Sequence, residues 1–160
     1  MSQPDLCTVR RVGVISDTHG LLRPQALAAL AGVEVILHAG DIGALAVIAG
    51  LETLAPVIAV RGNNDMEPWA HAIPETRDVR LRGMRIHLLH DIHLLAADAA
   101  AHVDMVIAGH SHRPLVEQRG AVLHLNPGSA GPRRFRLPVS VALLEHDGGR
   151  FAARIVELPI

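Results

Sequence analysis

Aromatic side chains, cysteine and long apolar stretches are all scarce in this sequence. Aromatic residues make up 2% of the 160 residues and Tyr is absent, so the core must be built from Ala, Val, Leu and Ile. The single cysteine, Cys7, excludes an internal disulfide and favours a reducing, cytoplasmic setting. No uncharged apolar run reaches the roughly 18 residues that suggest a membrane span. We also expect no signal peptide, because Asp5 comes early and no apolar stretch precedes Val12.

The charge balance excludes a strong global field. Fifteen Lys and Arg against sixteen Asp and Glu give a formal charge of -1, which predicts no general attraction to nucleic acid or to anionic membranes. The length fits one domain over residues 1–160. Eleven His is a high count, and several of them stand beside Asp or Gly at the ends of apolar runs.

Apolar periodicity predicts an α/β domain with two different halves. In the first half, strands are expected at 9–16, 33–37 and 57–60, with helices at 24–31 and 44–54 between them. This alternation indicates βαβ units and a parallel sheet. The second half predicts a helix at 94–102, a strand at 105–108, and hairpins at 76–82 with 84–89, 115–118 with 122–125, and 139–145 with 151–158.

Polar clusters follow five of the predicted strands. In open α/β sheets, ligands bind beyond the carboxyl ends of the strands, so these clusters could surround one point. The clusters are Asp17-Thr18-His19, Gly40-Asp41, Gly62-Asn63-Asn64-Asp65, His90-Asp91 and Gly109-His110-Ser111-His112.

The side chains in these clusters offer oxygen and nitrogen donors and no thiolate. That donor set suits Mn²⁺, Fe²⁺, Zn²⁺ or Ni²⁺ better than a thiophilic metal. A carboxylate can bridge two cations and reduce their repulsion, while neutral imidazoles bind them without adding charge. Two metals about 3.5–4 Å apart can share a hydroxide and stabilise the attacking and leaving oxygens of a phosphoryl centre.

The ordered motifs Asp-x-His, Gly-Asp, Gly-Asn-x-Asp, His and Gly-His-x-His resemble those of the calcineurin-like metallophosphoesterases. The short length and the segment Asn126-Pro127-Gly128-Ser129 are similar to the small bacterial and archaeal phosphodiesterases of that superfamily. The resemblance implies a four-layer α/β/β/α sandwich of two mixed β-sheets. It also implies hydrolysis of small phosphodiesters, including nucleotides or cyclic nucleotides, by a hydroxide that bridges two divalent ions.

The resemblance assigns roles to individual positions. Asp17, His19 and His112 would hold the first metal, and Asn63, His90 and His110 would hold the second. Asp41 would bridge the two ions, which we expect to be Mn²⁺, with Zn²⁺, Fe²⁺ or Ni²⁺ as alternatives. His110 and Asn64 would neutralise charge on the phosphoryl oxygens.

Two positions depart from the pattern of the family. Asn64 stands where many members carry a His that serves as general acid, so cleavage of esters with poor leaving groups is in doubt. Asp91 follows His90 where such proteins commonly have Gly, and its carboxylate could lie near the second metal or turn to solvent. A phosphomonoesterase and a non-catalytic scaffold are the alternative functions; the complete set of ligands favours an enzyme.

Several assignments stay open at this stage. His87 and His93 compete with His90, although the place after Leu88-Leu89 favours His90. His38 is either an orienting residue for a ligand or an ordinary buried histidine. We expect Asn126–Ser129 to form a structural turn under the site and not a catalytic loop. The cluster Arg133, Arg134 and Arg136 favours a solvated edge or a subunit contact in a homo-oligomer over a nucleic-acid patch, because no aromatic platform accompanies it.

Overall fold

The computed structural model describes residues 6–160. Its strands are β1 (Arg11–Ile15), β2 (Val35–His38), β3 (Val57–Ala59), β4 (Thr76–Leu81), β5 (Met84–Leu89), β6 (Met105–Ile107), β7 (Leu115–Arg119), β8 (Val122–Asn126), β9 (Ser140–Asp147) and β10 (Arg150–Glu157). Its helices are α1 (Pro24–Ala29), α2 (Leu45–Glu52), α3 (Ala97–Ala101) and two 3₁₀ turns, η1 (Pro68–Ala72) and η2 (Ile92–Leu94).

The strands form two mixed five-stranded sheets. The first sheet has the order β10-β9-β1-β2-β3, and β1, β2 and β3 run parallel as the βαβ pattern predicts. The second sheet has the order β4-β5-β6-β8-β7, in which β6 lies parallel to both neighbours. All three predicted hairpins are present as antiparallel pairs.

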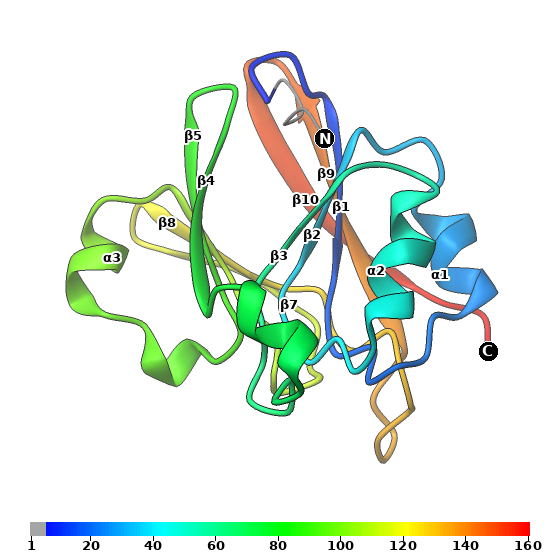
Figure 1. Cartoon of the computed structure of the whole chain (residues 1–160). Helices are drawn as coiled ribbons and strands as arrows, with labels where there is room; N and C mark the ends of the chain where they lie inside the picture. The colour runs from blue at the N-terminus through cyan, green and yellow to red at the C-terminus, as the bar shows by residue number, and fades with distance from the viewer. Residues whose placement is uncertain (1–5) are drawn as a thin grey trace.

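A dry apolar layer joins the two sheets. Alternate residues of β1, such as Val12 and Val14, pack in this layer against Ile86 and Leu88 of β5. Ile15 of β1 faces the other way and packs with the buried residues of α1 and α2. Because both faces of β1 are covered, its sequence from Val12 to Ile15 is apolar and does not alternate. Helices α1 and α2 therefore cover the outer face of the first sheet (Figure 1).

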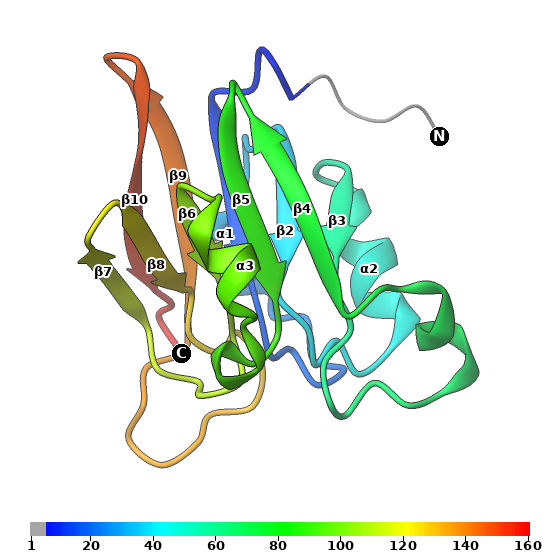
Figure 2. The ribbon, with the colours of Figure 1, turned by 90° about the vertical axis from the view of Figure 1, so that its left-hand side faces the viewer.

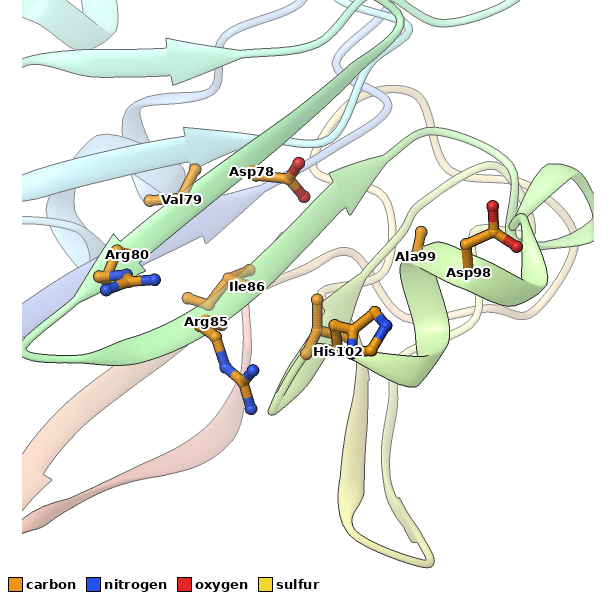
Figure 3. A pocket seen from close by; sticks show the side chains of 9 residues that line it. Asp78, Val79, Arg80, Arg85, Ile86, Asp98, Ala99 and His102 are labelled. Atoms are coloured by element: carbon orange, nitrogen blue, oxygen red, sulfur yellow. The ribbon is translucent and has the colours of Figure 1, made fainter.

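The outer face of the second sheet is more thinly covered. The predicted helix at 94–102 is wrong in extent: η2 and the five-residue α3 replace it, and Leu94 is 79% exposed. The Ala-rich segment offers few large apolar side chains, so it gains little by packing down on the sheet. A cavity of about 470 Å³ remains between α3 and the β4–β5 hairpin (Figure 3).

The layer order is α/β/β/α, as the family resemblance implies (Figure 2). The loops after β1, β2, β3, β5 and β6 gather at one end of both sheets, the lower end in Figure 1. Backbone hydrogen bonds join these loops, from Asp17 N–H to Gly40 O at 3.0 Å and from Gly109 N–H to His90 O at 2.9 Å. This end of the sandwich carries the polar clusters.

Candidate metal centre

A first group of candidate ligands joins the loop after β1 to the loop after β6. Ligand atoms of Asp17, His19 and His112 all lie within 4.8 Å of one another. His112 Nε2 is 3.3 Å from Asp17 Oδ1 and 3.4 Å from His19 Nε2. We call these three residues the first trio. Asp17 and His112 are buried, whereas His19 is partly exposed.

A second group joins the loops after β2, β5 and β6. Ligand atoms of Asp41, His90 and His110 also lie within 4.8 Å of one another, and we call these residues the second trio. His90 Nε2 is 3.3 Å from both Asp41 Oδ2 and His110 Nδ1. The other ring nitrogen of His90 faces the carbonyl of Ala39 at 2.8 Å, which leaves Nε2 directed at the trio.

Asp41 belongs to the second trio and also approaches the first trio. Its Oδ2 is 3.3 Å from His90 of the second trio and 3.8 Å from His19 of the first. Burial opposes ionisation of Asp41, but His90 and Asn64 outweigh it and lower the pKa of Asp41 below its ordinary value. An ionised carboxylate therefore stands where two neighbouring cations could share it.

The donor atoms of the first trio fit a cation. Asp17 Oδ1 is buried and has no hydrogen-bond partner among the described residues, because the nearby His112 Nε2 is not aligned for a hydrogen bond. Burial opposes ionisation of Asp17, yet His112, Ser16 and His90 lower its pKa. A buried, ionised and unpaired oxygen is costly unless a cation binds it.

The backbone around the centre is unusual. Five of the candidate ligands have a positive φ, which is uncommon for residues other than Gly, although Asn, Asp and His adopt it more often than the rest. Loop hydrogen bonds hold them there, such as His19 N–H to Asp41 O at 3.0 Å and His110 N–H to Asp17 Oδ2 at 3.0 Å. The five φ angles are 55° for Asp17, 46° for His19, 52° for Asp41, 70° for His110 and 62° for His112.

Two glycines allow the loops to approach the carboxylates. A side chain at Gly62 would overlap Asp41, and a side chain at Gly109 would overlap Ser16 and Asp17. Each carboxylate is therefore packed directly against a glycine backbone. This contact explains why a glycine precedes both the Asn63-Asn64 and the His110-Ser111-His112 segments.

The sequence profile of the calcineurin-like phosphoesterase superfamily domain matches residues 11–149. The chain belongs to this superfamily. A probable metallophosphoesterase of Methanothermobacter thermautotrophicus is 36% identical over 160 aligned residues, which cover 91% of each chain.

Two solved structures share the fold. The Escherichia coli phosphoesterase Yfce has a TM-score of 0.70 at 26% identity, covering 93% of this chain and 100% of that one. A zinc complex of Vps29 from Entamoeba histolytica has a TM-score of 0.69 at 25% identity, covering 92% and 98%. The predicted superfamily and its two-sheet architecture are confirmed.

Within this metallophosphoesterase fold, the three histidines near β5 take different positions. His90 faces Asp41, as described above. His87 lies earlier on β5 and its Nδ1 is 2.8 Å from Asp78 Oδ1 of β4, while the exposed His93 contacts Asp91. Of these three histidines, only His90 belongs to one of the trios.

The loop after β3 contributes two asparagines. Asn63 is exposed and lines a cleft of about 270 Å³ together with His90 and Asp91. Asn64 donates hydrogen bonds to both carboxylate oxygens of Asp41, from its backbone N–H to Oδ1 at 3.0 Å and from Nδ2 to Oδ2 at 2.9 Å. One function of Asn64 is thus to orient Asp41, which the sequence does not reveal.

Several residues around the centre act as supports. Asp65 accepts three backbone N–H bonds, from Ile42, Gly43 and Gly62, and so holds the Asp41 loop against the Asn63 loop. The Asn126–Ser129 turn lies under the site as predicted: Ser129 Oγ donates to Asp17 O at 2.9 Å. The sequence signal for Asp65 is its place at the end of the Gly-Asn-x-Asp motif.

His38 is a buried support and also touches both loops. Its Nε2 lies 3.0 Å from Thr18 Oγ1, and its Nδ1 accepts the N–H of Gly40 at 3.1 Å. Burial lowers the pKa of His38 to about 4. Both alternatives for His38 therefore apply in part: it is a buried, hydrogen-bonded histidine, and it positions the loops that carry the candidate ligands.

The nearby arginines have structural partners. Arg61 donates to Ile73 O at 3.0 Å and pairs with Glu75 at 3.2 Å. Arg23 donates to Gly131 O at 3.2 Å.

The described residues contain no helix long and apolar enough to cross a membrane.

Proposed function

We propose that this chain hydrolyses small phosphodiesters with two divalent ions. Asp17, His19 and His112 would hold the first ion, Asp41 would be shared, and the second ion would be held by a further set of ligands, namely Asn63, His90 and His110. The observation that carries the proposal is the position of Asp41, whose Oδ2 approaches histidines of both trios. Mn²⁺ is the proposed ion, with Zn²⁺, Fe²⁺ and Ni²⁺ as alternatives.

When bound, such ions lower the pKa of water and polarise a phosphoryl group. The residues of the chain then bind and orient the reactants. Asp41 is held in one rotamer by the two hydrogen bonds from Asn64. The amide of Asn64 has a second N–H, which would be free to meet a phosphoryl oxygen.

The proposed substrate is a small diester, such as a nucleotide or cyclic nucleotide. The cleft beside Asn63 and His90 holds about 270 Å³, which limits the group that can lie there. Asn64 has no proton to give to a departing alkoxide at neutral pH. Diesters with good leaving groups should therefore react faster than alkyl monoesters, and a phosphomonoesterase is the weaker alternative.

The test is a substrate panel on metal-free protein reloaded with one metal at a time. Bis-p-nitrophenyl phosphate, p-nitrophenyl phosphate and cyclic nucleotides would be compared after loading with Mn²⁺, Zn²⁺, Fe²⁺ or Ni²⁺. We expect diesterase activity with at least one ion and two ions per chain by elemental analysis. Folded protein that takes up no metal would overturn the proposal.

The alternative class is a scaffold that uses the same fold only as an interaction surface. Intact ligands at every predicted position favour an enzyme over this class. A protein that binds two ions yet hydrolyses nothing on the panel would support the scaffold. A cytoplasmic setting and a homo-oligomer remain part of the proposal, and size-exclusion chromatography with light scattering tests the latter.

A further inference from the structure

The two carboxylate oxygens of Asp91 have different surroundings. Oδ1 accepts the backbone N–H of His93 at 3.0 Å and so caps the short turn η2. The ring of His93 also lies 3.0 Å from Oδ1. Oδ2 takes no part in this cap and lies 3.9 Å from His110 Nε2.

The ring of His110 has a defined orientation between two partners. Its Nδ1 is 3.3 Å from His90 Nε2, and His90 Nε2 is in turn 3.3 Å from Asp41 Oδ2. Nδ1 of His110 therefore points into the second trio, and Nε2 points outward to Asp91. Imidazoles that bind metal commonly donate the proton on their far nitrogen to a carboxylate or carbonyl, which fixes the tautomer.

We propose that Asp91 is a positioning residue for His110. By accepting the proton of Nε2, it keeps the lone pair of Nδ1 available for a cation in the second trio. The inference rests on the proposed metal centre. His90 of the same trio has an equivalent support, since its Nδ1 faces the carbonyl of Ala39 at 2.8 Å.

His110 needs such support more than its neighbours do. Its side chain is 42% exposed, whereas the side chains of His90 and His112 are 5% and 3% exposed. Packing holds the buried rings, but an exposed ring keeps its rotamer freedom unless a polar partner restricts it. The two atoms are 3.9 Å apart in the structure, and the proposal requires a side-chain rotation that brings them to hydrogen-bond distance.

This arrangement also refines the role of His110. If the Nε2 proton is directed at Asp91, it is not available to a phosphoryl oxygen. His110 then acts as a ligand, and the free N–H of Asn64 is left to meet the phosphoryl group.

The variant that tests the proposal is Asp91→Asn. It keeps the size of the side chain and an oxygen that can cap His93, but it removes the carboxylate from His110. Zn²⁺ would be titrated into metal-free protein by calorimetry, and the bound ions counted by elemental analysis. We expect one of the two dissociation constants to rise by about 10–100-fold and the other to stay unchanged.

A double-mutant cycle separates this role from the capping role. In Asp91→Asn combined with His110→Asn, we expect no loss of affinity beyond that of His110→Asn alone, because Asp91 acts only through His110. Additive losses, or equal weakening of both sites, would show that Asp91 acts through the turn and would overturn the proposal. Asp91→Glu should recover part of the affinity.

The tautomer of His110 gives a readout that needs no metal. Long-range ¹H–¹⁵N spectra of the metal-free protein should show the proton on Nε2 in the wild type and a shift toward Nδ1 in Asp91→Asn. An unchanged tautomer would contradict the proposal. If the tautomer shifts but the wild type binds no metal, the orientation by Asp91 stands and the proposed function fails, so the two failures are distinguishable.

The matched control is Asp78→Asn. Asp78 also contacts a histidine, His87, at 2.8 Å, but it lines the cavity beside α3 on the outer face of the second sheet (Figure 3). Its replacement removes the same charge from a carboxylate–histidine pair away from the trios. Both Zn²⁺ dissociation constants should stay within about twofold of the wild type, because surface changes away from a site have small effects.

Discussion

The two trios use the same residue types but hold them by different means. In the first trio, His112 is buried and its outer nitrogen, Nδ1, has no hydrogen-bond partner among the described residues, so packing and the inward contacts of Nε2 fix the ring. In the second trio, the outer nitrogens of His90 and His110 face a carbonyl and a carboxylate. An imidazole can thus be oriented by burial or by a hydrogen bond, and this centre uses both.

The carboxylates of the two trios differ in the same sense as the imidazoles. Asp17 of the first trio has an oxygen with no hydrogen-bond partner in the described part of the chain, whereas both oxygens of Asp41 accept hydrogen bonds from Asn64. An unsatisfied buried polar group costs about 1–3 kcal/mol, which a bound cation would recover. Metal binding should therefore increase the free energy of unfolding more at the first trio than at the second trio.

The largest expected effect comes from replacing Asp41, the carboxylate that approaches histidines of both trios. Asp41→Asn keeps the shape but removes the negative charge that both ions would share. We expect diesterase activity to fall more than about 100-fold, beyond the usual cost of losing an outer support, with at least one ion lost. Activity and metal content of the purified, folded variant would be measured together.

The control for Asp41→Asn is His102→Asn, which changes an exposed residue beside the α3 cavity. It should leave activity almost unchanged. If Asp41→Asn stays active at saturating metal, or His102→Asn is inactive, the centre has been assigned to the wrong residues.

A support common to both trios predicts a pH effect. His38 has a pKa of about 4 in the folded protein, below the usual 6.5, so the unfolded chain binds the proton more readily. Stability from neutral His38 is complete above pH 6.5 and is lost as the pH falls toward 4. At pH 5 the loss is about 2 kcal/mol.

Urea unfolding of metal-free wild type and His38→Gln at pH 7.5 and pH 5 measures this effect. The glutamine does not titrate, so the free energy of unfolding should fall about 2 kcal/mol less in the variant than in the wild type. Equal pH dependence of the two proteins would rule out His38 as the source.

The two ways of holding an imidazole predict different stability costs for the same chemical change. His112→Asn and His110→Asn should each weaken the binding of one of the two proposed ions. His112 is buried, so its replacement leaves a cavity and should cost about 1–2 kcal/mol, whereas the exposed His110 should cost less than about 0.5 kcal/mol. Thermal unfolding of the metal-free variants checks the difference, and equal costs would remove the distinction between the trios.

The smallest expected effect is a gain. Asn64→His adds a group that can protonate a departing alkoxide, but it also breaks the hydrogen bond from Asn64 Nδ2 to Asp41. Because general acids contribute about 10²–10⁴-fold, we expect a net gain of about tenfold on alkyl diesters and little change on aryl diesters. No gain on poor leaving groups would show that this position does not govern protonation.

Much of the fold was accessible from the sequence because its signals are local. Apolar runs ended by Gly or Asp predicted the strands, and Gly83 and Gly148-Gly149 predicted hairpin turns. The short α3 and the 3₁₀ turn at Pro68–Ala72 were not predicted correctly, because their extent depends on how little apolar surface they can bury.

The candidate centre, too, could be predicted from the sequence only in part. The order of the motifs identified the residues that meet in the two trios, although their roles as metal ligands stay predictions. The support that Asn64 gives to Asp41 depends on a contact between distant loops, and no local pattern encodes it. His87 could have been set aside by strand periodicity alone, since it lies between Ile86 and Leu88, which face the core.

The positive φ angles of the ligand-bearing residues bear on how such a chain can diverge. Gly adopts this backbone region more easily than His does, so replacing the exposed His110 with Gly would relieve strain of about 1 kcal/mol, with no cavity left behind as at the buried His112. Loss of catalysis through an exposed ligand would therefore tend to stabilise its loop. A related protein that no longer needs to hydrolyse phosphodiesters could lose an exposed ligand and gain stability in that loop, so the fold can persist after the activity is lost.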